Sequence, residues 1–197
     1  MLSLFTEHPL LRERISEYIL RRGGVPRRDK LAGILREVLG AQVDAALLSQ
    51  YLRRYGAALE RELAAAPLVE GVASFIRRCG GPLYVSSSAP EAEVRDQLGR
   101  RGLHAHFAAV YGGDTPKADA LREIVRRHPG AETVFFGDSI GDWEAAREAG
   151  VAFVAVVSER DNFPAQGVTK LVDFAVPARI EAALQAALHE RATRPAG

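Results

Sequence analysis

The spacing of apolar residues along the chain changes near residue 67. Between residues 9 and 66 apolar residues recur every three or four positions, and the stretch PLLRERISEYILRR places Leu11, Ile15 and Ile19 on one face. This period predicts amphipathic helices. Two further stretches, RDKLAGILREVLG and VDAALLSQYLRRYGAALERELAAAP, keep the period, and Pro67 closes the run. We therefore expect a purely helical region over residues 9–66.

After Leu68 short apolar runs alternate with segments of helical period. Strands are predicted at 82–87, 107–113, 133–138 and 151–158, with a short one near 171–174. Helices are predicted near 70–79, 90–101, 117–128 and 142–149, and from 178 onward. Continuous apolar strands that alternate with helices are typical of a parallel sheet covered on both faces. The pattern predicts an α/β fold for this part of the chain.

Composition excludes several broad classes. Apolar residues make up 47% and charged residues 26%, which is ordinary for a globular protein. The formal net charge of +1 gives no bulk attraction to nucleic acid or to a membrane surface, so we expect neither as a partner. The sequence shows no apolar run of membrane-spanning length, no signal peptide and a single cysteine, Cys79. A cytoplasmic protein is expected, and its oligomeric state is left open.

Candidate chemistry gathers where three of the predicted strands end. The carboxyl ends of parallel strands meet at one edge of a sheet, where ligands bind. The polar side chains that follow these strands are Ser86, Ser87, Ser88, Asp114, Lys117, Asp138 and Asp142. Hydroxyls, one ammonium group and carboxylates are therefore expected to converge at this edge.

Asp138 and Asp142 have two interpretations. In the first, Asp138 and Ser139 cap the next helix and Asp142 is a solvated acid of its first turn. In the second, the carboxylates form a site for Mg²⁺, which proteins hold through one or two direct oxygens and several waters.

Lys117 and the serine run also have two interpretations each. Lys117 is one of only three lysines beside 23 arginines, and it begins a helix, where the helix dipole disfavours a cation. It is either a surface side chain or a point charge that faces an anionic ligand or a carboxylate. Residues 86–88 are either a plain loop, with Ser88 as a helix cap, or donors to a phosphoryl oxygen.

These segments together resemble the haloacid dehalogenase-like superfamily of phosphatases and phosphotransferases, in the branch similar to phosphoglycolate phosphatase and beta-phosphoglucomutase. The resemblance covers roughly residues 5–180 and rests on LYVSSSAP, TPKADAL and FFGDSIGDWEAAREAG. It implies that Ser86, or Ser87 one register away, and Lys117 bind phosphate, with Ser86 and Lys117 catalytic. It also implies Mg²⁺ as cofactor, with Asp138 as direct metal ligand and Asp142 as the outer carboxylate. The implied substrate is a small phosphorylated metabolite.

The resemblance also implies an organisation. It predicts a Rossmann-like three-layer parallel sheet core with an inserted helical cap. Residues 1–8 would be a remnant or substitute of the first core strand, 9–66 the cap, 67–190 the core and 191–197 a polar tail.

One element of the family pattern is absent from the sequence. Members carry Asp-x-Asp after a first, central strand, whose first Asp attacks phosphorus and whose second works as acid and base. Here no Asp-x-Asp occurs, and the first aspartate is Asp29. We therefore expect a phosphohydrolase with little or no turnover as written, and weaker Mg²⁺ binding. The alternative is a non-catalytic protein that binds a phosphate ligand or a partner.

Two explanations of this absence are open. Either the sequence is a shortened form of an active enzyme, or MLSLF is itself the first strand, with Thr6 in place of the nucleophile. An empty central position would leave backbone groups of both neighbouring strands without partners, at about 1–3 kcal/mol for each buried group. We therefore expect this position to be filled, with MLSLF as the local candidate.

Overall fold

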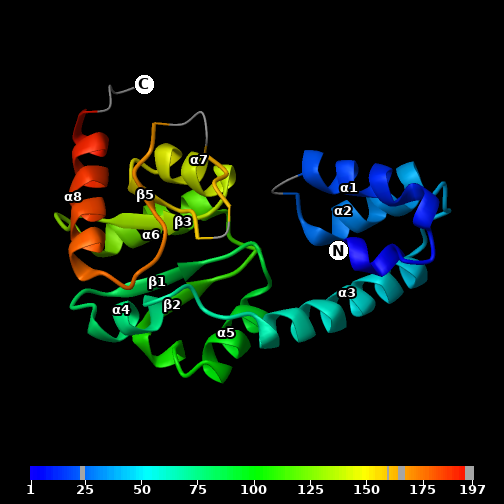
Figure 1. Ribbon diagram of the computed structural model, residues 1–197, viewed down its shortest axis with the longest axis horizontal. Coiled ribbons are helices and arrows are strands. Elements are labelled where there is room, and N and C mark those ends of the chain that lie inside the picture. The colour runs from blue at the N-terminus through cyan, green and yellow to red at the C-terminus, as the bar shows by residue number, and fades with distance from the viewer. Residues whose placement is uncertain (23–24, 159, 164–166, 194–197) are drawn as a thin grey trace. The chain divides into compact units, whose positions relative to one another are not determined.

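The computed structural model describes residues 1–197 except 23–24, 159, 164–166 and 194–197. The chain divides into two compact units, Met1–Ala66 and Pro67–Gly197 (Figure 1). Each unit has its own apolar core, and each is described by itself below.

The first unit is entirely helical. Its elements are η1 (Leu2–Phe5), η2 (Pro9–Leu11), α1 (Arg12–Arg21), α2 (Arg27–Gly33), η3 (Ile34–Val38) and α3 (Ala45–Ala65). Asp44 caps α3, because its side chain accepts a hydrogen bond of 2.7 Å from the backbone N–H of Leu47. Fully buried aliphatic side chains such as Ile15, Leu31 and Ile34 form the core. The periodic spacing of apolar residues thus produces the helices that it predicts.

The amino-terminal segment MLSLF belongs to this helical core. It forms the short helix η1, and the side chains of Leu4 and Phe5 are buried. The ring of Phe5 stacks on Tyr51 of α3 at 5.3 Å between centroids. Arg54 donates to the carbonyl oxygen of Leu4 at 3.2 Å and forms an ion pair with Glu7. The interpretation of MLSLF as the first core strand is therefore wrong: its large apolar side chains are buried against α3.

The second unit alternates strands and helices. Its strands are β1 (Leu83–Ser86), β2 (Phe107–Tyr111), β3 (Val134–Gly137), β4 (Ala152–Val156) and β5 (Lys170–Leu171). Its helices are α4 (Val72–Arg78), α5 (Glu91–Arg100), η4 (His104–His106), α6 (Lys117–Arg127), α7 (Ile140–Glu148) and α8 (Pro177–Thr193). All observed strand pairs are parallel, so the predicted α/β class is confirmed.

Successive residues of β3 and β4 face opposite layers of helices. Phe135 and Phe153 pack in one cluster with residues of α6 and α7. Phe136 and Val154 pack in a second cluster with residues of α4 and α8. Both faces of this sheet are therefore covered, which explains why its strands read as continuous apolar runs.

The strands form two sheets where one continuous sheet was expected. β1 pairs only with β2, and β3, β4 and β5 form a second sheet in that order, within the described part of the chain. No described strand lies on the other edge of β1 or of β3. The expectation that the central position would be filled is wrong for the described residues, because MLSLF, the local candidate, is held in the helical unit.

No helix among the described residues is both long enough and apolar enough to cross a membrane.

Candidate functional site

The turn between β3 and α7 is fixed by a reciprocal pair of hydrogen bonds. The hydroxyl oxygen of Ser139 accepts from the backbone N–H of Asp142 at 3.2 Å. Carboxylate oxygen Oδ2 of Asp142 accepts from the backbone N–H of Ser139 at 3.1 Å and from its hydroxyl at 2.6 Å. This capping box satisfies two helix-terminal donors and holds the Asp142 carboxylate in one orientation. Ser139 is the cap, as the capping interpretation predicted, and α7 begins at Ile140.

The Asp142 carboxylate is buried, with the whole residue only 4% exposed. The interpretation of Asp142 as a solvated first-turn acid is therefore wrong. Its second oxygen, Oδ1, accepts a hydrogen bond from the ammonium group of Lys117. A buried carboxylate costs several kcal/mol unless a charge and hydrogen bonds compensate it, and Lys117 and Ser139 supply both.

Lys117 is the first residue of α6, and its side chain is 22% exposed. A cation at a helix start opposes the helix dipole, and the nearby Asp142 carboxylate offsets this effect. The ion pair joins the first turns of two helices that follow different strands, since α6 follows β2 and α7 follows β3. Of the two interpretations of Lys117, the structure therefore supports a lysine that faces a carboxylate.

Glycines at two strand ends make room for these turns. A Cβ on Gly137 would lie 2.5 Å from the Cβ of Asp142, which is closer than real Cβ atoms come. A Cβ on Gly112, just after β2, would lie 2.4 Å from the backbone nitrogen of Glu91. Neither glycine is among the site residues predicted from the sequence, although a glycine next to a polar residue at a strand end indicates a close approach of the backbone.

Ser86 and Ser87 differ in what their hydroxyls do. The Ser86 hydroxyl, at the carboxyl end of β1, is buried and has no hydrogen-bond partner among the described residues. The Ser87 hydroxyl accepts from the backbone N–H of Ala89 at 3.1 Å, and the Ser87 N–H donates to the carbonyl of Tyr111 at 2.9 Å. Ser87 thus stabilises the loop through local hydrogen bonds. The Ser86 hydroxyl is a buried polar group without a hydrogen-bond partner, and such groups are rare in natural proteins.

Asp138 is exposed, and its backbone takes part in a hydrogen bond with a distant segment. The carbonyl oxygen of Asp138 accepts from the side-chain amide of Asn162 at 2.9 Å. Beside Asn162, hydrogen bonds from Lys170 and from the N–H of Phe163 lower the pKa of Asp161. The segment after β4 therefore stabilises the turn after β3, and no motif in the sequence predicts this contact.

The described residues at this turn offer few ligands to a Mg²⁺ ion. Among them no three His, Cys, Asp or Glu side chains gather as a metal-binding group. Both oxygens of Asp142 are already engaged by Lys117 and Ser139, which leaves Asp138 as the exposed carboxylate at the same turn. Mg²⁺ needs only one or two protein carboxylates beside water and substrate oxygens, so the exposed carboxylate of Asp138 is chemically suited to such a role.

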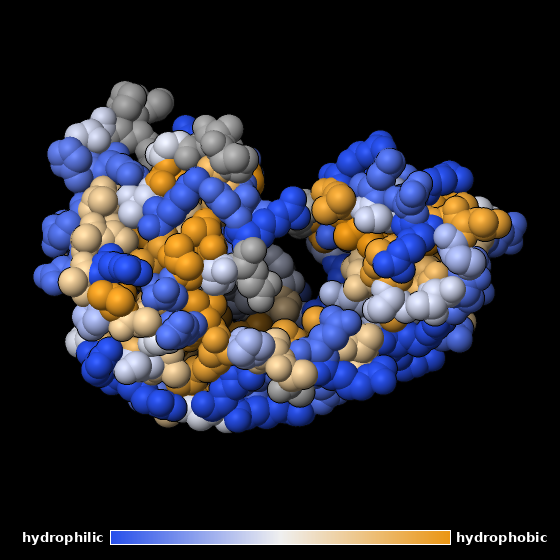
Figure 2. Space-filling view, in the orientation of Figure 1, coloured by the Kyte–Doolittle hydropathy of each residue, from blue (hydrophilic) through white to orange (hydrophobic). Residues whose placement is uncertain are grey.

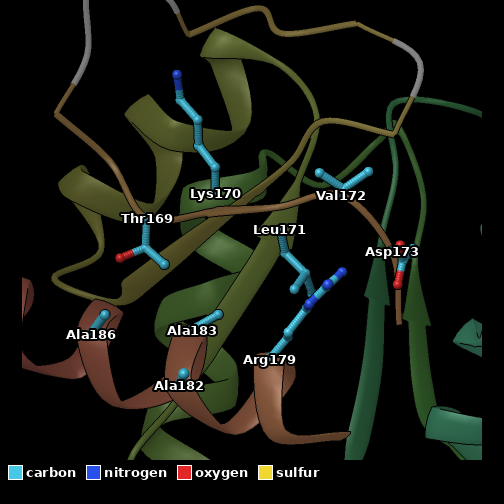
Figure 3. A pocket seen from close by; sticks show the side chains of 9 residues that line it. All are labelled: Thr169, Lys170, Leu171, Val172, Asp173, Arg179, Ala182, Ala183 and Ala186. Carbon is cyan, nitrogen blue, oxygen red and sulfur yellow. The ribbon is translucent and has the colours of Figure 1, made fainter. Parts of the chain in front are cut away.

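A separate pocket of about 380 Å³ lies beside β5 and α8 (Figure 3). Figure 3 shows Leu171 of β5 at this pocket, together with Arg179 and Ala183 of α8. Figure 2 shows apolar side chains at the surface of this unit, and Val172 beside the pocket is 57% exposed. None of the predicted site residues lines the pocket, so it is not the candidate site.

Comparison with known proteins supplies the family. Residues 15–156, more than half of the chain, match the family model described as haloacid dehalogenase-like hydrolase. Over 97 residues the chain is 31% identical to phosphoglycolate phosphatase of Pseudomonas syringae pv. syringae. That stretch is 46% of this chain and spans only 36% of the relative's length.

Two solved structures share the fold. One, from Thermotoga maritima and assigned as a beta-phosphoglucomutase, has a TM-score of 0.60 and 24% identity, over 89% of this chain and 92% of that one. The other is a haloacid dehalogenase-type hydrolase from Bacillus subtilis bound to magnesium, with a TM-score of 0.61 and 17% identity, over 89% and 82%. The predicted resemblance is confirmed by these matches: the chain belongs to the haloacid dehalogenase-like hydrolase family.

Proposed function

We propose that this chain carries the phosphate- and Mg²⁺-binding part of a phosphomonoester hydrolase that acts on a small phosphorylated metabolite. The observation that carries the proposal is the Lys117–Asp142 ion pair between the starts of α6 and α7. A partly exposed ammonium group held by a buried carboxylate suits the recognition of a small anion. The formal charge of +1 supports a small substrate more than nucleic acid, and a cytoplasmic location is part of the proposal.

Each residue has a definite task in this proposal. The Lys117 ammonium group neutralises phosphoryl oxygens, and Asp142 positions it. The buried Ser86 hydroxyl donates a hydrogen bond to a phosphoryl oxygen and so gains the partner that it lacks. Asp138 would hold Mg²⁺, which supplies further neutralisation of the phosphoryl charge. These groups orient and neutralise a phosphate ester, but none of them is placed as the attacking group.

The attacking carboxylate is absent from the sequence as given, because no Asp-x-Asp occurs in it. We therefore propose that the chain binds Mg²⁺ and phosphate but turns substrate over slowly or not at all. The same absence supports the alternative function, a phosphate-binding or partner-binding protein on the same scaffold. The helical unit of residues 1–66 would be the cap that selects the ligand in either case.

Ligand binding tests the shared part of both functions. We expect Asp138→Asn to weaken Mg²⁺ binding in calorimetric titration by at least tenfold, since it removes the exposed carboxylate. Glu144→Gln is the matched control, because Glu144 is an exposed acid of α7 that is not among the predicted site residues. Lys117→Ala should weaken the binding of inorganic phosphate. Equal Mg²⁺ affinities of wild type and Asp138→Asn would sink the metal assignment.

An added strand separates the two functions. We expect the chain extended at its amino end by an apolar strand ending in Asp-x-Asp to hydrolyse p-nitrophenyl phosphate in a Mg²⁺-dependent way. An otherwise identical extension ending in Asn-x-Asn is the control, since it adds the strand without the nucleophile. If both extensions raise the stability and neither hydrolyses a broad panel of esters, the scaffold is a binding protein. Comparable hydrolysis by the unextended chain would contradict the argument about the nucleophile.

A further inference from the structure

The residues after β4 hold one side-chain amide in a defined place. We refer to residues 161–163 as the anchor segment. The side chain of Phe163 is fully buried, and its ring lies 5.8 Å from the ring of Phe153 in β4, measured between centroids. The backbone N–H of Phe163 donates to Oδ1 of Asp161 at 2.8 Å, and Oδ2 of Asp161 pairs with Lys170 of β5 at 2.7 Å. This ion pair is partly exposed and contributes little, so the buried ring is the main restraint on the anchor segment.

Asn162, in the middle of the anchor segment, binds the peptide group that follows Asp138. Its side-chain amide donates to the carbonyl oxygen of Asp138 at 2.9 Å. The N–H of the same peptide group belongs to Ser139 and donates to Oδ2 of Asp142 at 3.1 Å. A peptide group is planar, so hydrogen bonds at both of its ends fix its rotation about the chain. The anchor segment and the first turn of α7 therefore hold the backbone just after Asp138 from two sides.

The direction of the Asp138 carboxylate depends on this backbone. Asp138 is exposed, so close packing does not hold its side chain. On its amino side, the pairing of Gly137 with Ala155 of β4 fixes the end of β3. On its carboxyl side, the peptide group bound by Asn162 fixes the start of the turn. Mg²⁺ demands near-ideal octahedral geometry, so a ligand whose backbone rotates loses affinity even though its carboxylate is intact.

We propose that Asn162 is a positioning residue for Asp138: its amide holds the peptide group after Asp138 and so directs the carboxylate towards a divalent cation. The inference rests on the proposed function, in which Asp138 holds Mg²⁺. In this role Asn162 touches neither the metal nor the phosphate and acts only through the backbone of Asp138. Groups that orient metal ligands change the affinity by about 10–100-fold. A single bond to one backbone oxygen places Asn162 at the lower end of this range.

Calorimetric titration of the full chain with Mg²⁺ tests the inference. We expect Asn162→Ala to weaken Mg²⁺ binding about tenfold. Thermal unfolding should be nearly unchanged, because the bond to Asp138 lies at the surface. Asn162→Gln keeps an amide donor on a longer side chain and should recover part of the affinity. Gln185→Ala is the matched control, because it removes an exposed side-chain amide of α8 and should leave Mg²⁺ binding unchanged.

A double-mutant cycle with Asp138→Asn shows whether Asn162 acts through Asp138. The carboxylate is absent from the Asp138→Asn background, so adding Asn162→Ala should have no further effect on the residual Mg²⁺ binding. A residue that only stabilised the loop would lower the affinity in both backgrounds.

Hydrogen exchange provides a readout without metal. Asn162→Ala should speed exchange at the amide of Ser139, because its peptide group loses one of two hydrogen bonds. The amide of Val151, which donates to the carbonyl oxygen of Ala146 at 2.8 Å, is the control and should not change.

Three outcomes would overturn the inference. They are equal Mg²⁺ affinities of wild type and Asn162→Ala, an equal loss of affinity in the Asp138→Asn background, and faster exchange at Ser139 and Val151 alike. If the wild type binds no Mg²⁺, the metal assignment of the proposed function fails instead, and exchange at Ser139 decides whether Asn162 positions Asp138. Faster exchange confined to Ser139 then supports the positioning role, and unchanged exchange contradicts it.

Discussion

Replacing Lys117 by methionine should destabilise the α/β unit more than any exposed substitution at the same turn. The change removes the cation that faces a carboxylate whose side chain is only 6% exposed. Breaking a buried ion pair by removing one partner costs about 3–5 kcal/mol, because the other charge stays buried. The Lys117 side chain is 22% exposed, so the pair is not fully buried, and Ser139 still bonds to Asp142 in the variant. We therefore expect a loss of stability at the lower end of this range, about 3 kcal/mol.

A double-mutant cycle with Asp142→Asn isolates the pair. Asparagine keeps an oxygen for the Ser139 bonds but removes the charge, so the double variant should recover about 2 kcal/mol of the loss. In thermal unfolding, 3 kcal/mol corresponds to a decrease of roughly 6–12 °C in Tm. Asp138→Asn, an exposed acid in the same turn, is the control and should change stability by less than about 0.5 kcal/mol. A coupling energy below about 0.5 kcal/mol would refute the reasoning.

Three further predictions concern backbone approach, core packing and pH. Gly137→Ala should lower the free energy of unfolding by about 1–3 kcal/mol, because the added Cβ meets the side chain of Asp142. A Cβ on Gly141 has its nearest neighbour at 3.9 Å, so Gly141→Ala should be neutral or stabilising, and urea unfolding compares the two variants. Phe75→Ala should cost about 3 kcal/mol through lost contacts with Phe136 and Phe174, against no measurable loss for the exposed Ser74→Ala. The hydrogen bond from Arg54 lowers the pKa of Glu7 below 4.5, so this pair stabilises above about pH 4.5 and is lost as pH falls through the lowered pKa. Glu7→Gln should therefore flatten the decline in stability between about pH 5 and 3, as measured by thermal unfolding across this range.

The sequence predicts most elements of the fold because local patterns decide them. The five strands and the helices between them lie where the apolar runs and the helical periods place them, with boundaries shifted by at most three residues. The approach of Lys117 and Asp142 could also be expected, since parallel strands bring their carboxyl ends to one edge. Rules of this kind depend on neighbours along the chain and on the alternation of strands and helices, both of which can be read from the sequence.

Other features depend on contacts between distant residues and could not be predicted. The sequence leaves Asp142 as either a solvated first-turn acid or part of a metal site, and its near-complete burial could not be read from local patterns. The brace from Asn162 to Asp138 joins residues 24 positions apart in a segment without a recognisable motif. Ser86 and Ser87 are equivalent in the sequence. In the structure they differ because the Ser87 hydroxyl accepts a hydrogen bond from the N–H of Ala89, whereas the Ser86 hydroxyl has no partner among the described residues.

The prediction that MLSLF forms the first core strand was wrong because it considered only the cost of unpaired strand edges. Buried backbone groups of a strand edge are costly to leave unpaired, and the apolar segment MLSLF precedes the helical region just as the first core strand does in the family pattern. Its side chains, however, find deeper burial elsewhere: Leu4 is 4% and Phe5 is 3% exposed in the helical unit, with Tyr51 stacked on one ring. Burial of a large apolar side chain contributes about 1.5–3 kcal/mol, so two of them can outweigh several half-solvated backbone groups. The burial of Leu4 and Phe5 therefore explains why MLSLF lies in the helical unit and pairs with neither β1 nor β3.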